Sequence, residues 1–109
     1  MVVEWLGIIK KQPAEIVTEN VDFKNVIRSG EVASSVAVAV FDNSLTNVTN
    51  SYISGTPTTS SNGFTQFVLQ AGSHGDYRDV RVRLTTDAGN VYEEDLLLRV
   101  WEIGGASDF

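Results

Sequence analysis

The sequence contains no cysteine, one histidine and two prolines in 109 residues. Without cysteine, the chain can form neither a disulfide framework nor a thiolate metal site. No segment approaches the roughly 18 apolar residues that favour a membrane-spanning helix, so we expect no membrane partner. The apolar residues 2–9 are interrupted by Glu4 and follow no basic segment, so we do not expect a secretory signal. These absences favour assembly in a cytoplasm and stability from the chain's own core or from neighbouring subunits.

The charge of the chain is unbalanced toward acid. Fourteen Asp and Glu against eight Lys and Arg give a net charge of −6. Binding to nucleic acid needs clustered basic residues that replace counterions, and the basic residues here are scattered. We therefore expect no nucleic-acid partner. A hydrophobic fraction of 42% in 109 residues is typical of a single globular domain.

The strongest pattern lies in residues 75–101. Apolar and charged residues alternate from Val80 to Leu84, and apolar residues recur at every second position from Leu96 to Val100. A period of two sends successive side chains to opposite faces of a strand. The intervening residues 85–90 are turn formers that include a glycine, so the pattern predicts a β-hairpin with one apolar face.

The other face of this hairpin carries charges. Glu93, Glu94 and Asp95 are adjacent in the second strand, so their side chains alternate between faces and cannot converge on a calcium ion. We expect the acidic run to face Arg81 and Arg83 across the hairpin. This segment therefore predicts a charged surface and no metal site.

Shorter strands are predicted at residues 16–23, 33–41 and 64–69, with a weaker one at 48–53 and a loop at 55–63. Residues 33–41 are apolar on both faces, which favours a central strand that is covered on both sides. Phe67 and Leu69 are expected in the core, and no helix is predicted. Short strands with regular turns indicate an all-β, Ig-like sandwich of about seven antiparallel strands, with terminal arms.

A tyrosine before the hairpin fits such a sandwich. Ig-like domains often place a tyrosine there that bonds back to the backbone at a sheet corner, and Tyr77 has that position. Tyr77 is out of phase with Val80, so we expect a bulge near Arg78 and Asp79 to bring it inward.

We expect one domain at residues 11–101. Residues 1–10 are either a first strand that Pro13 ends or an arm that docks on another subunit, and the sequence leaves both open. Residues 102–109 form a tail that a pair of glycines makes flexible, and it is expected to be a second arm or disordered.

No catalytic residue and no cofactor site is expected. His74 lies in a Gly- and Ser-rich turn without a recognisable nucleophile partner, so a solvated side chain is the stronger interpretation. Trp5 and Trp101 are candidates for stacking on sugar rings, but single tryptophans more often close a core or an interface. The function is therefore expected to come from what the folded surface binds.

Several short motifs are shared with one family. They are Lys11-Gln12-Pro13-Ala14-Glu15, Val21-Asp22-Phe23, Ser29-Gly30-Glu31 before SSVAVAVFD, and FVLQAGSHGDYRDVRVRLTTDAGNVYEEDLLLRV. In these motifs the chain resembles the small Ig-like virion proteins of tailed phages, in particular the fibre-to-tail adaptors, over residues 11–101. Ala71 departs from the pattern, where a second glycine beside Gly72 is expected. The resemblance implies a protein without an active site that is present in many copies and joins parts of a virion.

We therefore expect a non-enzymatic virion protein, assembled in the host cytoplasm, that joins tail, fibre or neck proteins through edge strands and arms. A homo-oligomeric ring or another multicopy assembly is expected. The alternatives are a capsid decoration or neck protein of the same fold, and a carbohydrate-binding Ig-like module. The residues expected at protein interfaces are Trp5, Leu6, Ile8, Ile9, Trp101, Ile103 and Phe109.

Overall fold

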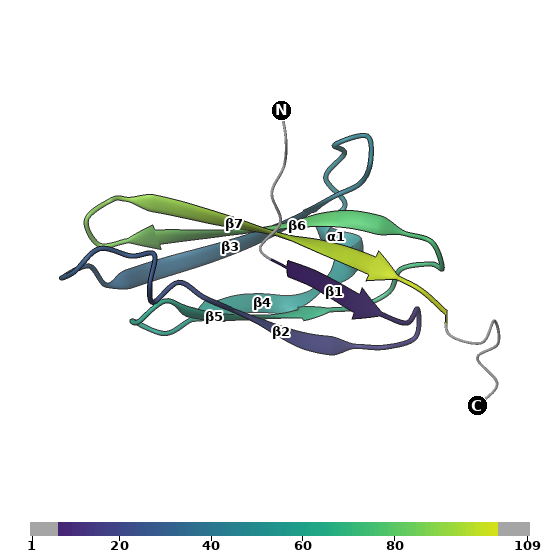
Figure 1. Ribbon diagram of the computed structural model, residues 1–109, viewed down its shortest axis with the longest axis horizontal. Helices are drawn as coiled ribbons and strands as arrows, with labels where there is room; N and C mark the ends of the chain where they lie inside the picture. Colours follow the sequence, from purple (N-terminus) through teal and green to yellow (C-terminus); the bar gives the residue numbers. More distant parts are fainter. Residues whose placement is uncertain (1–6, 103–109) are drawn as a thin grey trace.

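The computed structural model describes residues 7–102, which fold into two facing β-sheets (Figure 1). The elements in chain order are β1 (Gly7–Lys11), β2 (Val17–Asp22), β3 (Ala33–Phe41), α1 (Thr49–Tyr52), β4 (Ile53–Thr59), β5 (Phe64–Leu69), β6 (Tyr77–Thr86) and β7 (Val91–Val100). One sheet has the strand order β1-β7-β6-β3 and the other β2-β5-β4. The predicted all-β sandwich is confirmed. Within residues 7–102, no helix is long and apolar enough to cross a membrane.

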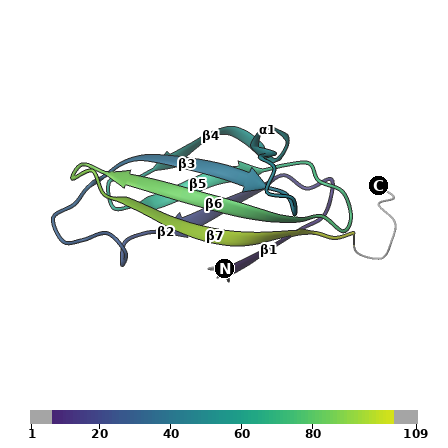
Figure 2. The same cartoon turned by 90° about the horizontal axis from the view of Figure 1, so that it is seen from above.

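The predicted hairpin is the centre of the larger sheet (Figure 2). β6 and β7 pair without a register shift from Tyr77 opposite Arg99 to Thr85 opposite Val91. Gly89 at the turn has φ +82°, a conformation that costs glycine little. The inward side chains are all buried in the core: Val80, Val82, Leu84, Leu96, Leu98 and Val100. Burying such aliphatic side chains is the main favourable contribution to folding, about 1.5–3 kcal/mol each.

The charged face of the hairpin is also as predicted. The Nε atom of Arg81 donates to Asp95 Oδ1 at 3.0 Å, and the Nε atom of Arg83 donates to Glu93 Oε2 at 2.7 Å. The hydrogen bond that Arg81 donates to Asp95 is the largest cause of the raised pKa of Arg81. The Arg83–Glu93 pair is exposed and contributes little to stability, whereas the Arg81–Asp95 pair is partly buried.

The smaller sheet closes the sandwich. β5 pairs with β2 on one side and with β4 on the other, both antiparallel. Phe67 and Leu69 face the core, as predicted, and Phe23, just after β2, is completely buried. Ile27 packs against this cluster from the loop that follows. The two sheets therefore share one apolar interior.

The prediction of a central strand at residues 33–41 is wrong. Within residues 7–102, β6 is the one strand that pairs with β3, so β3 forms an edge of its sheet. Its outward Ala37 and Ala39 lie opposite Arg83 and Arg81, and the Arg81 guanidinium lies 5.3 Å from the centre of the Phe41 ring. The Arg81 side chain thus lies over the outer apolar position at Phe41, whereas the small Ala37 side chain stays exposed, so an edge strand can be apolar on both faces.

Residues 48–63 also differ from the prediction. Residues 49–52 form the short helix α1, and residues 55–59 of the predicted loop belong to the strand β4, which begins at Ile53. β4 is an edge strand whose register shifts between Ser54 and Thr58, and both features make Pro57 tolerable there. The β-branched threonines around Pro57 favour a strand, although Gly55 and Pro57 give the segment the composition of a turn.

Tyr77 does not form the predicted corner. The register through Arg78 and Asp79 contains no bulge, so Tyr77 stays on the outer face of the sheet. The buried tyrosine at this end is Tyr52, whose hydroxyl donates to Asp76 Oδ2 at 2.7 Å and accepts from Arg78 Nε at 3.0 Å. Asp76 and Arg78, at the start of β6, therefore provide hydrogen-bond partners for the hydroxyl of the buried Tyr52.

β1 is the exception to antiparallel pairing. It runs parallel to β7, from Gly7 opposite Leu96 to Lys11 opposite Val100. Ile9 of β1 is buried in the core, whereas Ile8 points to the outer face. Residues 7–11 are thus an integral strand, and residues 1–6 lie outside the described part of the chain.

Glu31 connects the loop between β2 and β3 to the tip of the β6–β7 hairpin through hydrogen bonds. Its carboxylate accepts hydrogen bonds from the side chains of Thr86, Asn90 and Tyr92 and from the backbone N–H of Arg28. The bond from Thr86 is the largest cause of the lowered pKa of Glu31, because these donors stabilise its charged form.

At the opposite end of the sandwich, Lys11 connects two loops through hydrogen bonds. Its side chain is 2% exposed, and its Nζ atom donates to the carbonyls of Gln12, Pro13 and Ala71. Burial lowers the pKa of Lys11, and the charge of Glu15 partly opposes this change. Ala71, at the position where the family pattern suggests glycine, has φ +60°, which glycine adopts more easily. One buried ammonium therefore ties the β1–β2 turn to the β5–β6 loop.

We expect Lys11→Met to destabilise the fold by about 1–3 kcal/mol, because three carbonyls lose their donor while the apolar stem is kept. Lys10→Met removes the same charge from an exposed neighbour and should change stability by less than about 0.5 kcal/mol. Urea unfolding followed by circular dichroism measures both. Equal stabilities of the two variants would show that Lys11 is not a structural anchor.

We expect Glu31→Gln to lower the urea midpoint at about pH 7, because the amide brings N–H groups toward the Thr86 and Tyr92 hydroxyls. The stabilisation by the carboxylate is present above its unfolded-state pKa of 4.5 and is lost as the pH falls through the lower folded-state pKa. The difference from wild type should therefore shrink on acidification. Glu94→Gln, on the same hairpin, is the control, and a difference that stays constant to about pH 3 would contradict the assignment.

Candidate interaction surface

Exposed apolar side chains gather on the outer face of the β1-β7-β6-β3 sheet, toward the end where β1 and β7 finish. Ile8 and Leu97 are opposite each other on β1 and β7, and Tyr77 lies on β6 opposite Arg99. We call the following five residues the apolar patch: Ile8, Leu45, Tyr77, Leu97 and Trp101. Ile8 is 58% and Trp101 46% exposed, and it is the grouping of such side chains on one face, not their single exposure, that marks a candidate interaction site.

Leu45 stands at the tip of a rigid turn beside this face. It is 80% exposed and has φ +62°, a strained conformation for a leucine. The Asp42 carboxylate accepts from the backbone N–H groups of Ser44 and Thr46, each at 2.9 Å. Leu45, Tyr77 and Leu97 contribute to the lining of a surface hollow of about 280 Å³. The turn therefore holds an apolar side chain toward solvent next to an apolar hollow.

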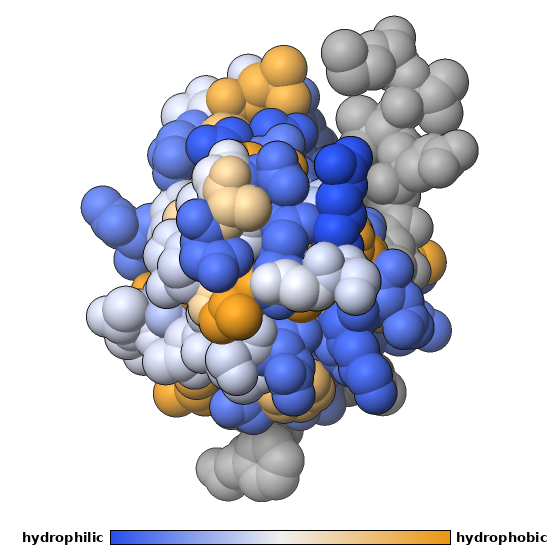
Figure 3. All heavy atoms as spheres, turned by 90° about the vertical axis from the view of Figure 1, so that its left-hand side faces the viewer, coloured by the Kyte–Doolittle hydropathy of each residue, from blue (hydrophilic) through white to orange (hydrophobic). Residues whose placement is uncertain are grey.

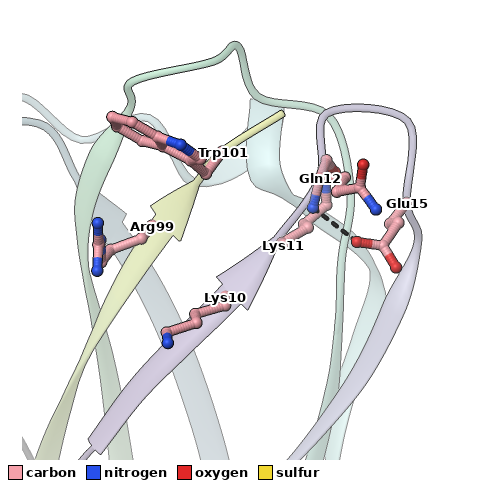
Figure 4. A pocket seen from close by; sticks show the side chains of 6 residues that line it. All are labelled: Lys10, Lys11, Gln12, Glu15, Arg99 and Trp101. Carbon is pink, nitrogen blue, oxygen red and sulfur yellow. Dashed lines mark hydrogen bonds between the residues drawn. The ribbon is translucent and has the colours of Figure 1, made fainter. Parts of the chain in front are cut away.

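A second hollow, of about 370 Å³, lies where β1 and β7 end and has three cationic side chains in its lining (Figure 4). We call it the cationic hollow, and it is lined by Lys10, Lys11, Gln12, Glu15, Arg99 and Trp101. The guanidinium of Arg99 lies 5.5 Å from the Tyr77 ring centre and 5.7 Å from the Trp101 ring centre. Arg99 therefore joins the apolar patch to the cationic hollow.

His74 supports Trp101. Its ring centre lies 4.3 Å from that of Trp101, and its Nδ1 atom accepts a hydrogen bond from the Glu102 backbone N–H at 2.9 Å. The side chain is exposed, as predicted, but it is not a free solvated group. His74 thus orients an exposed tryptophan at the end of β7.

β1 also presents a backbone edge. The Lys11 carbonyl accepts from the Trp101 N–H, so the backbone groups of Lys11 face β7. Alternation along the strand turns the N–H and C=O groups of Ile8 and Lys10 the other way. Within residues 7–102, β1 pairs with β7 alone. Such an edge can accept a further strand.

The remaining exposed apolar side chains are more dispersed. The end of the sandwich that carries the hairpin turn is mostly polar, with separate apolar spots (Figure 3). On the outer face of the smaller sheet, Phe64 is accompanied by polar residues such as Asn20 and Gln66. Among residues 7–102, no group of three or more His, Asp or Glu side chains is arranged to hold a metal ion.

The structure places three of the residues that were expected at interfaces. Ile8 and Trp101 lie in the apolar patch, whereas Ile9 is 5% exposed and has almost no surface left for a partner. Trp5, Leu6, Ile103 and Phe109 lie outside the described residues. Sequence reasoning missed Leu45, Tyr77, Leu97 and Arg99. The alternation of β7 gave a usable signal for Leu97 and Arg99, because its buried positions are Leu96, Leu98 and Val100.

Comparison with known proteins gives one family. A family model described as the podophage GP4 fiber-tail adaptor protein gp77 matches residues 11–99. This span runs from the last residue of β1 almost to the end of β7. A search of curated proteins gives no match. Because the family model covers most of the sequence, the chain belongs to the podophage GP4 fiber-tail adaptor family.

Proposed function

We propose that this chain is a non-enzymatic virion protein that joins phage tail and fibre components through the apolar patch and the free edge of β1. The exposed Ile8, which lies opposite the half-buried Leu97 beside that edge, is the observation that carries the proposal. A partner strand added to β1 would complete its backbone hydrogen bonds and cover Ile8. The apolar patch would then become the buried centre of the interface.

The terminal segments are proposed as arms. Because β1 and β7 are parallel, residues 1–6 and 103–109 are attached at opposite ends of this strand pair. Arms that leave from opposite ends would meet different neighbours. Trp5, Leu6, Ile103 and Phe109 are the apolar side chains that such arms would bring to those contacts.

We further propose a multicopy assembly, which the two separate contact regions of the chain would permit. If one copy contacts the next through two different surfaces, the interface is heterologous, and repeated contacts close into a ring when the rotation permits. We therefore propose a homo-oligomer in the virion, bound to tail and fibre proteins. A position on the capsid or in the neck, seen by electron microscopy of particles, would replace this proposal with one of the two alternatives.

We expect Ile8→Ser and Trp101→Ala each to reduce fibre attachment more than about tenfold, because central apolar residues contribute about 2 kcal/mol or more to an interface. The matched controls are Ile16→Ser and Phe64→Ala, which alter side chains that are 70% and 42% exposed elsewhere on the molecule. The measurement is the fraction of fibre-bearing particles, counted by electron microscopy after assembly with each variant.

Circular dichroism and thermal unfolding of the purified variants separate lost attachment from lost folding. Normal attachment by both surface variants, when they are folded, would remove the apolar patch from the interface. Equal losses in the two control variants would show that the effect is not specific to this face.

A further inference from the structure

Arg99 differs from the other arginines of the hairpin. Arg78, Arg81 and Arg83 each form an ion pair with an acidic residue. Arg99 forms none within residues 7–102, and its Nε atom is buried without a hydrogen-bond partner. A buried, unsatisfied donor on a charged group costs free energy, which calls for an explanation in a native structure.

Arg99 is surrounded by two aromatic rings and a second cation, an arrangement suited to binding an anion. The Cζ atom of Arg99 lies 5.5 Å from the centre of the Tyr77 ring and 5.7 Å from that of Trp101. These two rings restrict the orientation of the guanidinium. Lys10 lies opposite Arg99 on β1, and the two side chains extend toward the same side (Figure 4). Two cations on neighbouring strands therefore border one hollow of about 370 Å³ that has an aromatic wall.

The residues that line the cationic hollow carry more positive than negative charge. Glu15 is the acidic residue in its lining, and its Oε1 atom already accepts a hydrogen bond from the Gln12 backbone N–H at 2.6 Å. Lys11 is engaged with backbone carbonyls, so Arg99 and Lys10 are the cations left for a ligand. The planar fork of an arginine matches the two oxygens of a carboxylate. This corner is thus positive in a chain whose net charge is −6.

We propose that the cationic hollow binds the carboxylate of an Asp or Glu side chain carried by an extended segment of a partner protein. A peptide is favoured over other anions because Lys10 belongs to the free edge strand itself. A strand that pairs with β1 would send every second side chain to the outer face, next to Lys10. The identity of that partner rests on the proposed function, whereas recognition of the carboxylate rests on Arg99 and Lys10 alone.

The test is a titration of the purified chain with a capped synthetic peptide of alternating Glu and Val, followed by NMR. The signals observed are the Arg99 Nε–H and the Trp101 indole N–H. We expect saturable shifts of both signals, weakened at high salt, and binding of the matched Gln–Val peptide that is at least about tenfold weaker. Indistinguishable binding of the two peptides, or no saturable shift, would overturn the proposal.

Variants locate the site. Arg99→Gln and Lys10→Gln should each weaken binding of the Glu–Val peptide at least about fivefold, and Arg99→Lys should restore only part of it. For these variants the Trp101 indole signal reports binding. Arg83→Gln removes a cation of the same face that is paired with Glu93 and should leave the affinity unchanged. Unchanged binding by Arg99→Gln, or an equal loss in Arg83→Gln, would refute the assignment.

Glucuronic acid is the third probe, because it offers a carboxylate on a sugar ring that could stack on Trp101. Binding of glucuronic acid as tightly as the Glu–Val peptide would identify an acidic-sugar site and overturn the peptide proposal. The adaptor proposal is tested separately, since Ile8→Ser and Trp101→Ala are scored by fibre attachment. Peptide binding with normal attachment by those variants would leave the carboxylate site standing and the adaptor interface refuted.

Discussion

The register of β6 against β7 determines most of this structure. It places the aliphatic core side chains on one face and the Arg81–Asp95 and Arg83–Glu93 pairs on the other, with no register shift over the paired residues. The aliphatic face, from Val80 to Val100, gives the smaller sheet a surface on which to pack. The same register puts Leu97 and Arg99 on the outside, beside β1. A shift of one residue would exchange the two faces, so the core and the interaction surface depend on the same pairing.

The two ends of the sandwich are held by buried or partly buried charges that are bonded to groups distant in sequence. Glu31 joins the β2–β3 loop to the hairpin tip, and Lys11 joins the β1–β2 turn to the carbonyl of Ala71. A charge taken out of water is stable only where several dipoles or hydrogen bonds replace its hydration. These two residues therefore act where the aliphatic core ends and where loops need a fixed position.

The sequence was sufficient to predict the hairpin, its ion pairs and the strand at residues 64–69, because these depend on local alternation. It was not sufficient for β3, whose outer Ala37 and Ala39 lie opposite Arg83 and Arg81 of a strand distant in sequence. β4 was missed because Pro57 and the neighbouring glycine resemble a loop, although an edge strand tolerates both. The same limit applies to the cationic hollow, since the pairing of Lys10 with Arg99 arises only when β1 joins β7.

An unpaired strand edge is a liability, because it can pair with any exposed strand. Here the edge carries Lys10, with Arg99 beside it, and charge at an edge disfavours unselective pairing. The same two cations would favour a segment that brings a carboxylate to this position, because each would then gain a charged partner. Repulsion of unsuitable strands and attraction of a suitable one would thus come from one pair of residues. On this proposal, the buried Nε donor of Arg99, which has no hydrogen-bond partner within residues 7–102, would gain one from the partner segment in the assembled interface.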